Sequence, residues 1–168
     1  EIEGMSIEDS ALDFFSKNEI KNLKIFLYKS DKYYSFASDK YKSKNYDAVQ
    51  IHIKKNDKSY KIATIDGLKI FKNDINGCNK LKDQIIKELL TMFPKGIVKN
   101  QSGSHSYDAT GNSKFYRKTI TINDTKFPSI MITCDQWSKK LQNKFTDKLS
   151  VTITQDSFEN FMNNEAYK

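Results

Sequence analysis

The sequence predicts an α+β fold in which two or three helices cover antiparallel sheet of about six to eight strands. Helical patterns lie near the beginning, the middle and the end of the chain, and runs of strands separate them. This order, helix–strands–helix–strands–helix, favours an α+β layer over a Rossmann-like fold. The chain has 168 residues, which is typical of one domain, so we expect residues 1–168 to form a single domain.

The first 45 residues predict one helix and one strand. Ser6 is a good N-cap, and apolar residues recur at helical spacing after it, which predicts a helix from Ile7 to Lys17. Residues 18–22 predict a short further helical turn. The stretch 23–45 is ambiguous, and within it only residues 33–37 predict a strand.

The clearest strand pattern follows. Val49, Ile51 and Ile53 alternate with polar residues, which is the period of a half-buried strand. This alternation places His52 on the polar face of the strand. Residues 56–65 are expected to turn and run back.

A hairpin turn is predicted at Asp66 and Gly67, because Asp-Gly is a preferred dipeptide of two-residue hairpin turns. Residues 68–71 should therefore form the third strand of a meander. An amphipathic helix is expected over residues 74–93, ending before Pro94. Its apolar stripe follows three- and four-residue steps through Ile75, Cys78, Leu81, Ile85, Leu89 and Met92.

The last third of the chain predicts strands and a final helix. Residues 95–114 are long for a structureless loop, so we expect a hairpin with its tip at residues 108–112 and a return arm over 115–123. Strands are then expected over 129–135 and 148–154. Asp156 or Ser157 should cap a last helix that buries Phe158, Phe161 and Met162.

Cys78 and Cys134 are both expected to face the core, Cys78 on its helix and Cys134 beside Ile130 and Ile132 on a strand. Two such cysteines can form a disulfide when their Cα atoms lie about 5.5 to 6 Å apart. Closing the loop between them is worth about 4 kcal/mol on the chain-entropy model. We therefore predict a Cys78–Cys134 bridge, with two buried free thiols as the alternative.

The sequence predicts no catalytic residue, no cofactor and no metal ligand. It contains no GxGxxG, GxxxxGK[ST], HExxH or GxSxG motif, and no CxxC or HxxxH spacing. The segment 103–108, "GSHSYD", holds Ser, His and Asp together, but triads assemble in space and rarely from one loop. We interpret that segment as a polar hairpin tip.

The net charge of +7 raises the question of nucleic-acid binding. Arg117 is the only arginine, so the planar guanidinium that reads phosphate and guanine edges is almost absent. The lysines are spread along the chain among acidic residues. Nucleic acid is therefore a disfavoured partner. The sequence also contains no apolar run of about 18 residues, so it predicts no transmembrane segment.

Five aromatic residues form the candidate binding surface. Trp137, the only tryptophan, is expected either to pack at the sheet edge near the bridge or to anchor a partner. The other four are tyrosines from a stretch in which aromatic residues alternate with lysines. This stretch could cradle a sugar, a peptide or an anionic surface. Alternatively, the tyrosines are half-buried and the lysines lie in water. The four tyrosines are Tyr33, Tyr34, Tyr41 and Tyr46.

Several segments resemble a family of small uncharacterised exported proteins from AT-rich marine alphaproteobacteria. They are "EIEGMSIEDSALDFFS", "YDAVQIHIKKNDKSYKIATIDGLKIFKNDINGCNKLKDQI", "ITCDQW" and "LSVTITQDSFENFMNNEAYK". The resemblance implies a signal peptide that is removed, which agrees with a chain that starts at Glu1 and with the expected bridge. It carries no activity, ligand or catalytic residue.

We therefore expect a periplasmic or secreted, non-enzymatic binding module for a protein, a peptide or an envelope component. A small hydrolase-like enzyme with an unrecognised site is the first alternative. A structural subunit of an envelope or extracellular assembly is the second. The sequence does not indicate the oligomeric state.

Overall fold

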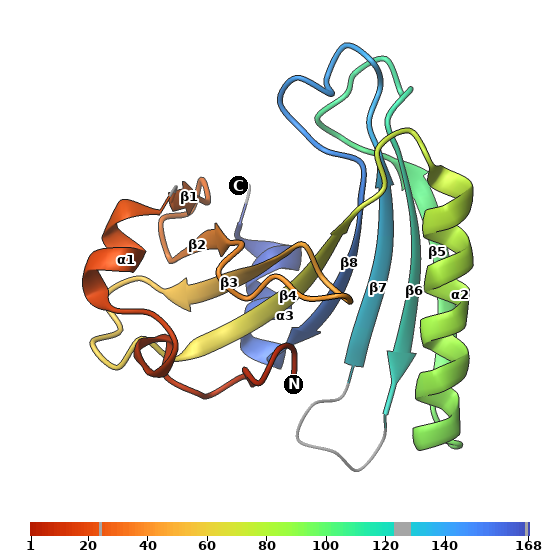
Figure 1. The fold of residues 1–168 in the computed structure, drawn as a ribbon. Helices are drawn as coiled ribbons and strands as arrows, with labels where there is room; N and C mark the ends of the chain where they lie inside the picture. The colour runs from red at the N-terminus through yellow and green to blue at the C-terminus, as the bar shows by residue number, and fades with distance from the viewer. Residues whose placement is uncertain (24, 123–128, 167) are drawn as a thin grey trace. The chain divides into compact units, whose positions relative to one another are not determined.

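The computed structural model describes residues 1–23, 25–122, 129–166 and 168, and it has the predicted α+β fold (Figure 1). Its helical elements are the 3₁₀ helix η1 (Ala11–Asp13), α1 (Lys17–Asn22), α2 (Ile75–Met92) and α3 (Asp156–Asn164). Its strands are β1 (Ile25–Leu27), β2 (Tyr33–Ser38), β3 (Ala48–Lys54), β4 (Ile62–Ile70), β5 (Ile97–Ser104), β6 (Lys114–Thr121), β7 (Ser129–Gln136) and β8 (Lys148–Thr154).

The strands form one antiparallel sheet of eight strands in the order β1-β2-β3-β4-β8-β7-β6-β5. The described chain divides into two compact units. Unit 1 comprises residues 1–67 and 152–168, and unit 2 comprises residues 68–151. Strands β4 and β8 each begin in one unit and end in the other.

The helix predicted from Ile7 to Lys17 is wrong, because the backbone of this segment pairs with the chain that leads into β4. The N–H groups of Glu8 and Ala11 donate to the carbonyl oxygens of Ile62 and Tyr60, each at 2.9 Å. These tertiary hydrogen bonds replace the helical ones. The apolar pattern nevertheless indicates burial correctly, since Ile7, Ala11 and Phe15 lie in the core.

The short helical turn predicted at residues 18–22 is confirmed as part of α1. Ser16 and Glu19 form a capping box, in which each side chain accepts a hydrogen bond from the other residue's backbone N–H. The strand predicted at residues 33–37 is confirmed as β2. Its neighbour β1 was not predicted, because all three of its residues are apolar and exposed and so show no alternation.

The hairpin turn predicted at Asp66 and Gly67 is wrong, since β4 runs through both residues. The Asp66 carboxylate is held between neighbouring strands by His52 and Thr152. A Cβ on Gly67 would lie 2.5 Å from the Tyr46 ring, so this glycine permits a close approach and makes no turn. The expected third strand is the second half of β4.

Unit 2 confirms the long amphipathic helix as α2, which lies along β6 and β7 (Figure 1). Asp74 caps it by accepting a hydrogen bond from the N–H of Gly77 at 2.8 Å. The buried stripe differs from the predicted one, because it includes Lys82 and leaves Met92 63% exposed. The fully buried members are Cys78, Lys82, Ile86 and Leu89.

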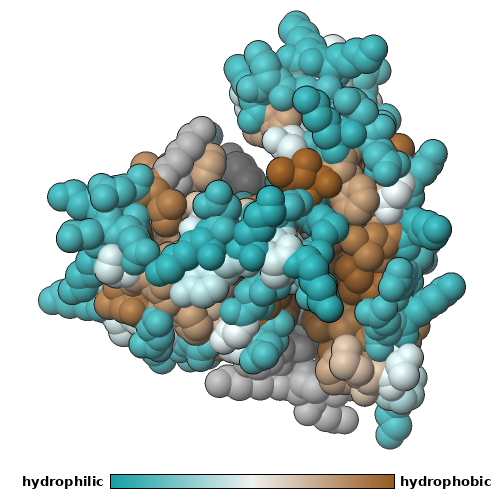
Figure 2. All heavy atoms as spheres, in the orientation of Figure 1, coloured by the Kyte–Doolittle hydropathy of each residue, from teal (hydrophilic) through white to brown (hydrophobic). Residues whose placement is uncertain are grey.

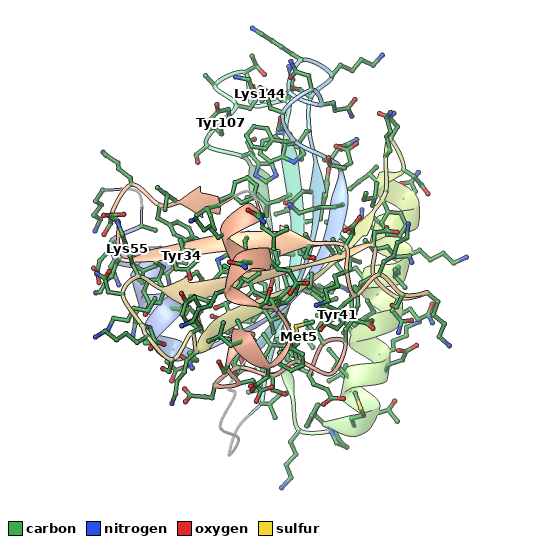
Figure 3. All side chains as sticks on the ribbon, turned by 60° about the vertical axis from the view of Figure 1, so that its left-hand side comes forward. Met5, Tyr34, Tyr41, Lys55, Tyr107 and Lys144 are labelled. Atoms are coloured by element: carbon green, nitrogen blue, oxygen red, sulfur yellow. A yellow bond between two sulfur atoms is a disulfide. The ribbon has the colours of Figure 1, made fainter. Side chains whose placement is uncertain are left out.

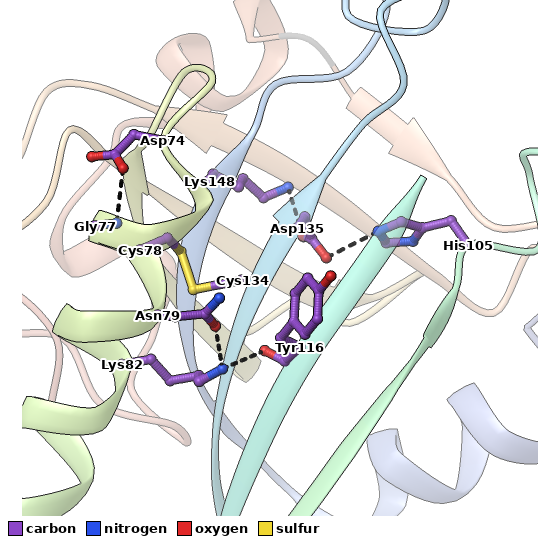
Figure 4. Close-up of a disulfide and its surroundings, with 10 residues drawn as sticks. All are labelled: Asp74, Gly77, Cys78, Asn79, Lys82, His105, Tyr116, Cys134, Asp135 and Lys148. Carbon is purple, nitrogen blue, oxygen red and sulfur yellow. Dashed lines mark hydrogen bonds and ion pairs between the residues drawn. A yellow bond between two sulfur atoms is a disulfide. The ribbon is translucent and has the colours of Figure 1, made fainter. Parts of the chain in front are cut away.

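The disulfide between Cys78 and Cys134 is present, with Cα atoms 6.0 Å apart (Figure 4). It joins the first turns of α2 to β7, in the core of unit 2. Lys82 lies one helical turn further along, and its ammonium donates to the side chain of Asn79 and to the carbonyl oxygen of Tyr116. Burial lowers the pKa of the Lys82 side chain.

The remaining strands and the last helix are confirmed. The predicted hairpin is β5 and β6, which pair in register from Ile97 opposite Thr121 to Ser104 opposite Lys114. The predicted return arm ends at Asn123, which lies outside the described residues. Helix α3 buries Phe158 and Phe161 as expected, but its N-cap is Gln155 and not Asp156 or Ser157, and Met162 is only half-buried. No helix in the described part of the chain is long and apolar enough to cross a membrane.

Candidate functional site

The connections β5–β6 and β7–β8 bring four rings together at one end of unit 2. We call residues 105–113 and 137–147 the loop end. The ring of Trp137 stacks on His105 and on Phe145, with 4.1 Å between centroids in each case. Tyr107 meets Phe145 edge-on at 5.0 Å. We call His105, Trp137, Phe145 and Tyr107 the ring stack.

Tyr107 is the exposed member of the ring stack, with 61% of its surface accessible. His105, Trp137 and Phe145 are half-buried. Lys144, labelled with Tyr107 in Figure 3, belongs to the other loop and precedes Phe145, the residue that Tyr107 contacts. The ring stack therefore fixes one accessible phenol ring on a rigid aromatic base.

Asp108 orders the first loop. Its carboxylate accepts hydrogen bonds from the backbone N–H and the hydroxyl of both Ser113 and Thr110, at 2.6 to 3.1 Å. The Ser113 hydroxyl in turn accepts from the N–H of Ser138, at 3.0 Å, which ties the two loops together. The hydroxyl of Ser113, with that of Thr110, holds the pKa of the Asp108 carboxyl well below its ordinary value of 3.8.

Asp147 orders the second loop. Its Oδ1 accepts from the backbone N–H of Trp137 at 2.7 Å, and its Oδ2 accepts from the Gln142 amide at 3.0 Å and the Asn73 N–H at 3.2 Å. Asp147 is buried. Both acidic residues of the loop end, Asp108 and Asp147, are thus used inside the protein.

The outer surface of the loop end is positively charged. Lys139, Lys140 and Lys144 are exposed, and within the described ranges none of their ammonium groups pairs with a carboxylate. Figure 2 shows the loop end, at the top of the view, covered mostly by hydrophilic side chains. The nearby Asp135 lies 3.3 Å from His105 and 3.9 Å from Lys148 (Figure 4).

A second polar cluster lies inside unit 1. The Tyr28 hydroxyl is 2.6 Å from Nδ1 of His52, and Nε2 of His52 is 2.8 Å from Oδ2 of Asp66. The Thr152 hydroxyl donates to Oδ1 of Asp66 at 2.5 Å. We call these four residues the hydrogen-bond chain.

His52 lies on the predicted face of its strand, opposite Val49, Ile51 and Ile53, but this face is covered, and His52 is only 6% exposed. Phe158 of α3 covers its ring, with centroids 5.0 Å apart. The alternation along β3 is correct, but α3 buries the polar side as well. Asp66, buried between β3 and β8, was missed because it was assigned to a turn.

The structure does not bring the five predicted surface aromatics into one cluster. Tyr33 is buried against Phe158 and Phe161, whereas Tyr34 follows it in β2 and so points to the opposite side of the sheet. The other members are half-buried: Tyr41 donates to the carbonyl oxygen of Phe14, Tyr46 covers Gly67, and Trp137 belongs to unit 2.

Sequence reasoning named Trp137 but missed its partners. His105 and Tyr107 lie in the segment interpreted as a polar tip, and Phe145 follows a run of polar residues without any periodicity. The two loops meet only in the folded chain, so no local pattern could show the stack. The only sequence signal for the ring stack is that aromatic residues occur in both connections, β5–β6 and β7–β8.

Neither cluster is a metal centre by composition, since no group of three or more His, Cys, Asp or Glu residues gathers within the described residues. No protein-family model, curated protein or solved structure matches the chain. No family is assigned. The function is therefore inferred from the geometry of the loop end and of the hydrogen-bond chain.

Proposed function

We propose that the protein is an exported binding module whose loop end holds an acidic polysaccharide of the cell envelope or its surroundings. One observation carries this proposal. The exposed Tyr107 ring packs edge-on against Phe145, which follows Lys144 in the chain, and no carboxylate within the described residues pairs with the exposed lysines of that loop.

The charge at the loop end favours an anionic ligand. Three ammonium groups project from residues 139–144, while Asp108 and Asp147 face inward and accept hydrogen bonds. A cluster of one sign attracts an oppositely charged polymer and raises its association rate. Carboxylates or sulfates spaced along a polysaccharide can contact several flexible lysines at once.

The exposed ring favours a sugar as the unit that carries this charge. The face of an aromatic ring is electron-rich, so the C–H groups of a pyranose pack well against it. The loop that carries Tyr107 also exposes the hydroxyl of Ser106 and the amide of Asn112.

Nucleic acid fits this surface less well. Nucleic-acid sites use arginine for bidentate phosphate and base contacts. Arg117 lies on β6 and bonds to Thr133, and the loop end itself contains lysines only. An acidic glycan needs charge and a ring face, and both are present.

The Cys78–Cys134 bridge supports export to the periplasm or to the cell exterior. Disulfides persist in oxidising compartments and are rare in the cytosol. The resemblance to exported proteins agrees with this location. An envelope or extracellular polysaccharide would be within reach of the protein there.

Affinity electrophoresis tests the proposal, with an acidic polysaccharide such as polygalacturonate, or neutral dextran, cast into a native gel. The wild-type protein should be retarded by the acidic polymer and not by dextran. The triple variant K139Q/K140Q/K144Q should lose the retardation. The matched triple variant K80Q/K87Q/K95Q, which removes the same charge on and after α2, should keep it. Equal loss in both variants would show binding by net charge alone and would contradict the proposal.

A further inference from the structure

We propose that Tyr28 is an activated nucleophile that accepts the acyl group of small apolar esters, with His52 as its base and Asp66 as the residue that orients the base. The proposal concerns unit 1 and is independent of ligand binding by unit 2. It stands on the geometry of the hydrogen-bond chain, in which three consecutive contacts of 2.5 to 2.8 Å join four residues.

The contacts of Asp66 determine which nitrogen of His52 can act as the base. Both carboxylate oxygens are acceptors, one for the Thr152 hydroxyl and one for His52 Nε2–H. In the neutral imidazole Nδ1 is then a bare acceptor, and the Tyr28 hydroxyl donates its proton to it. This is the nucleophile–base–orienter arrangement of a catalytic triad, with a phenol in place of the serine hydroxyl.

The burial of the four residues agrees with these roles. His52, Asp66 and Thr152 are buried, whereas Tyr28 is half-buried. The base and its orienting carboxylate are shielded from water, and Tyr28 is the least buried member of the hydrogen-bond chain. A buried imidazole–carboxylate pair in the centre of a sheet costs more to desolvate than an apolar pair of similar volume. A catalytic role for the His52–Asp66 pair would explain why the protein retains this cost.

The surroundings of Tyr28 indicate the kind of acyl group. Its ring packs edge-on against Phe161 at 5.3 Å and against Phe158 at 6.0 Å. Met162 packs against the same cluster. These side chains are apolar, so a short alkanoyl group suits the neighbourhood of the phenol better than a charged one.

The acyl-transfer step balances without any further reactant. The Tyr28 O–H bond breaks, and its proton moves to Nδ1 of His52, where Asp66 stabilises the imidazolium. The phenolate oxygen forms a bond to the ester carbonyl carbon. The ester C–O bond then breaks, and the departing alkoxide or phenolate takes the proton from Nδ1. The products are O-acyl-Tyr28 and an alcohol.

Acetylation by p-nitrophenyl acetate tests this inference, with peptide mapping by mass spectrometry to separate the tyrosines. Tyr107 is the internal control, because it is more exposed and hydrogen-bonds to no base within the described residues. At neutral pH, Tyr28 should be acetylated at least about tenfold faster than Tyr107. A Tyr28 rate equal to or below the Tyr107 rate in the wild-type protein would overturn the proposal.

The variant H52Q adds a second, independent criterion. Glutamine keeps an amide donor for Asp66 but cannot act as a base. A folded H52Q, verified by circular dichroism, should acetylate Tyr28 no faster than Tyr107. Fast acetylation of Tyr28 in folded H52Q would also overturn the proposal. If H52Q does not fold, the wild-type comparison of the two tyrosines decides.

Discussion

Asp147 accepts a hydrogen bond from the backbone N–H of Trp137 at 2.7 Å, across the two ends of the β7–β8 loop, which carries Trp137 and Phe145 of the ring stack. Because Asp147 is buried and also holds Gln142 and Asn73, it fixes this loop more firmly than the surface position of the loop suggests. The rigidity of the loop end depends on this carboxylate and on Asp108.

Replacing Asp147 with alanine should therefore loosen the loop end. The free energy of unfolding should fall by about 1 to 3 kcal/mol, because buried donors lose their acceptor. The emission of Trp137 should shift to the red as water reaches the indole. Urea unfolding followed by fluorescence measures both effects. As a control, D83A removes an exposed carboxylate of the same unit and should change stability by less than about 0.5 kcal/mol.

Asp108 should make the loop end sensitive to acid. Its pKa in the folded protein lies well below the ordinary value of 3.8, so the unfolded chain binds the proton more tightly. The stabilisation is therefore complete above about pH 5 and is lost progressively as the pH falls through the folded pKa. Near-UV circular dichroism between pH 6 and pH 1 should show the aromatic signal weaken only at the acidic end.

The variant D108N tests the origin of this acid dependence. It cannot ionise, so the stabilisation should be missing at every pH and the acidic change in the aromatic signal should disappear. If the variant keeps the wild-type acid profile, another carboxyl group causes the change and the assignment to Asp108 is wrong.

The order of elements could be predicted from the sequence where each element is amphipathic. Helix α2, the hairpin β5–β6 and the disulfide follow from periodicity and from the faces of Cys78 and Cys134. The helix expected at Ile7 failed because its backbone pairs with the chain before β4, which is remote in sequence. Local spacing indicates that a residue is buried, but not which hydrogen bonds its backbone forms.

The candidate sites were largely beyond sequence reasoning for a similar reason. Asp66 has the local sequence of a turn, and only the strands on both sides show that it lies inside a sheet. Lys82 has the polarity of a surface residue, yet it is buried one turn from the bridge. Both sites depend on groups that come from separate elements and meet only after folding.

Removing the disulfide should cost about 4 kcal/mol of unfolding free energy, since the bridge closes a loop of 56 residues. The double variant C78A/C134A, compared with the wild-type protein in urea, measures this loss. Thiol labelling under denaturing conditions serves as the control, because neither cysteine should react before a reductant is added. Equal stability of the two proteins would mean that the bridge is dispensable for the fold.

Gly67 is predicted to tolerate no side chain. The Cβ of alanine would lie 2.5 Å from the Tyr46 ring, so G67A should destabilise the protein by about 1 to 3 kcal/mol. In a Tyr46→Ala background the ring is gone, and the additional cost of G67A should largely vanish. A double-mutant cycle of these two changes measures the coupling. Additive effects would show that the ring is not the obstacle.

The most direct test of the account is a titration of Trp137 fluorescence with polygalacturonate, because this only tryptophan lies within the proposed binding site. We predict a saturable change in emission that weakens about tenfold in affinity in Y107A and is unchanged in M92A, which removes a side chain of similar exposure. Retardation of the protein by the polymer without any change in Trp137 emission, or equal affinity in Y107A, would contradict binding at the loop end.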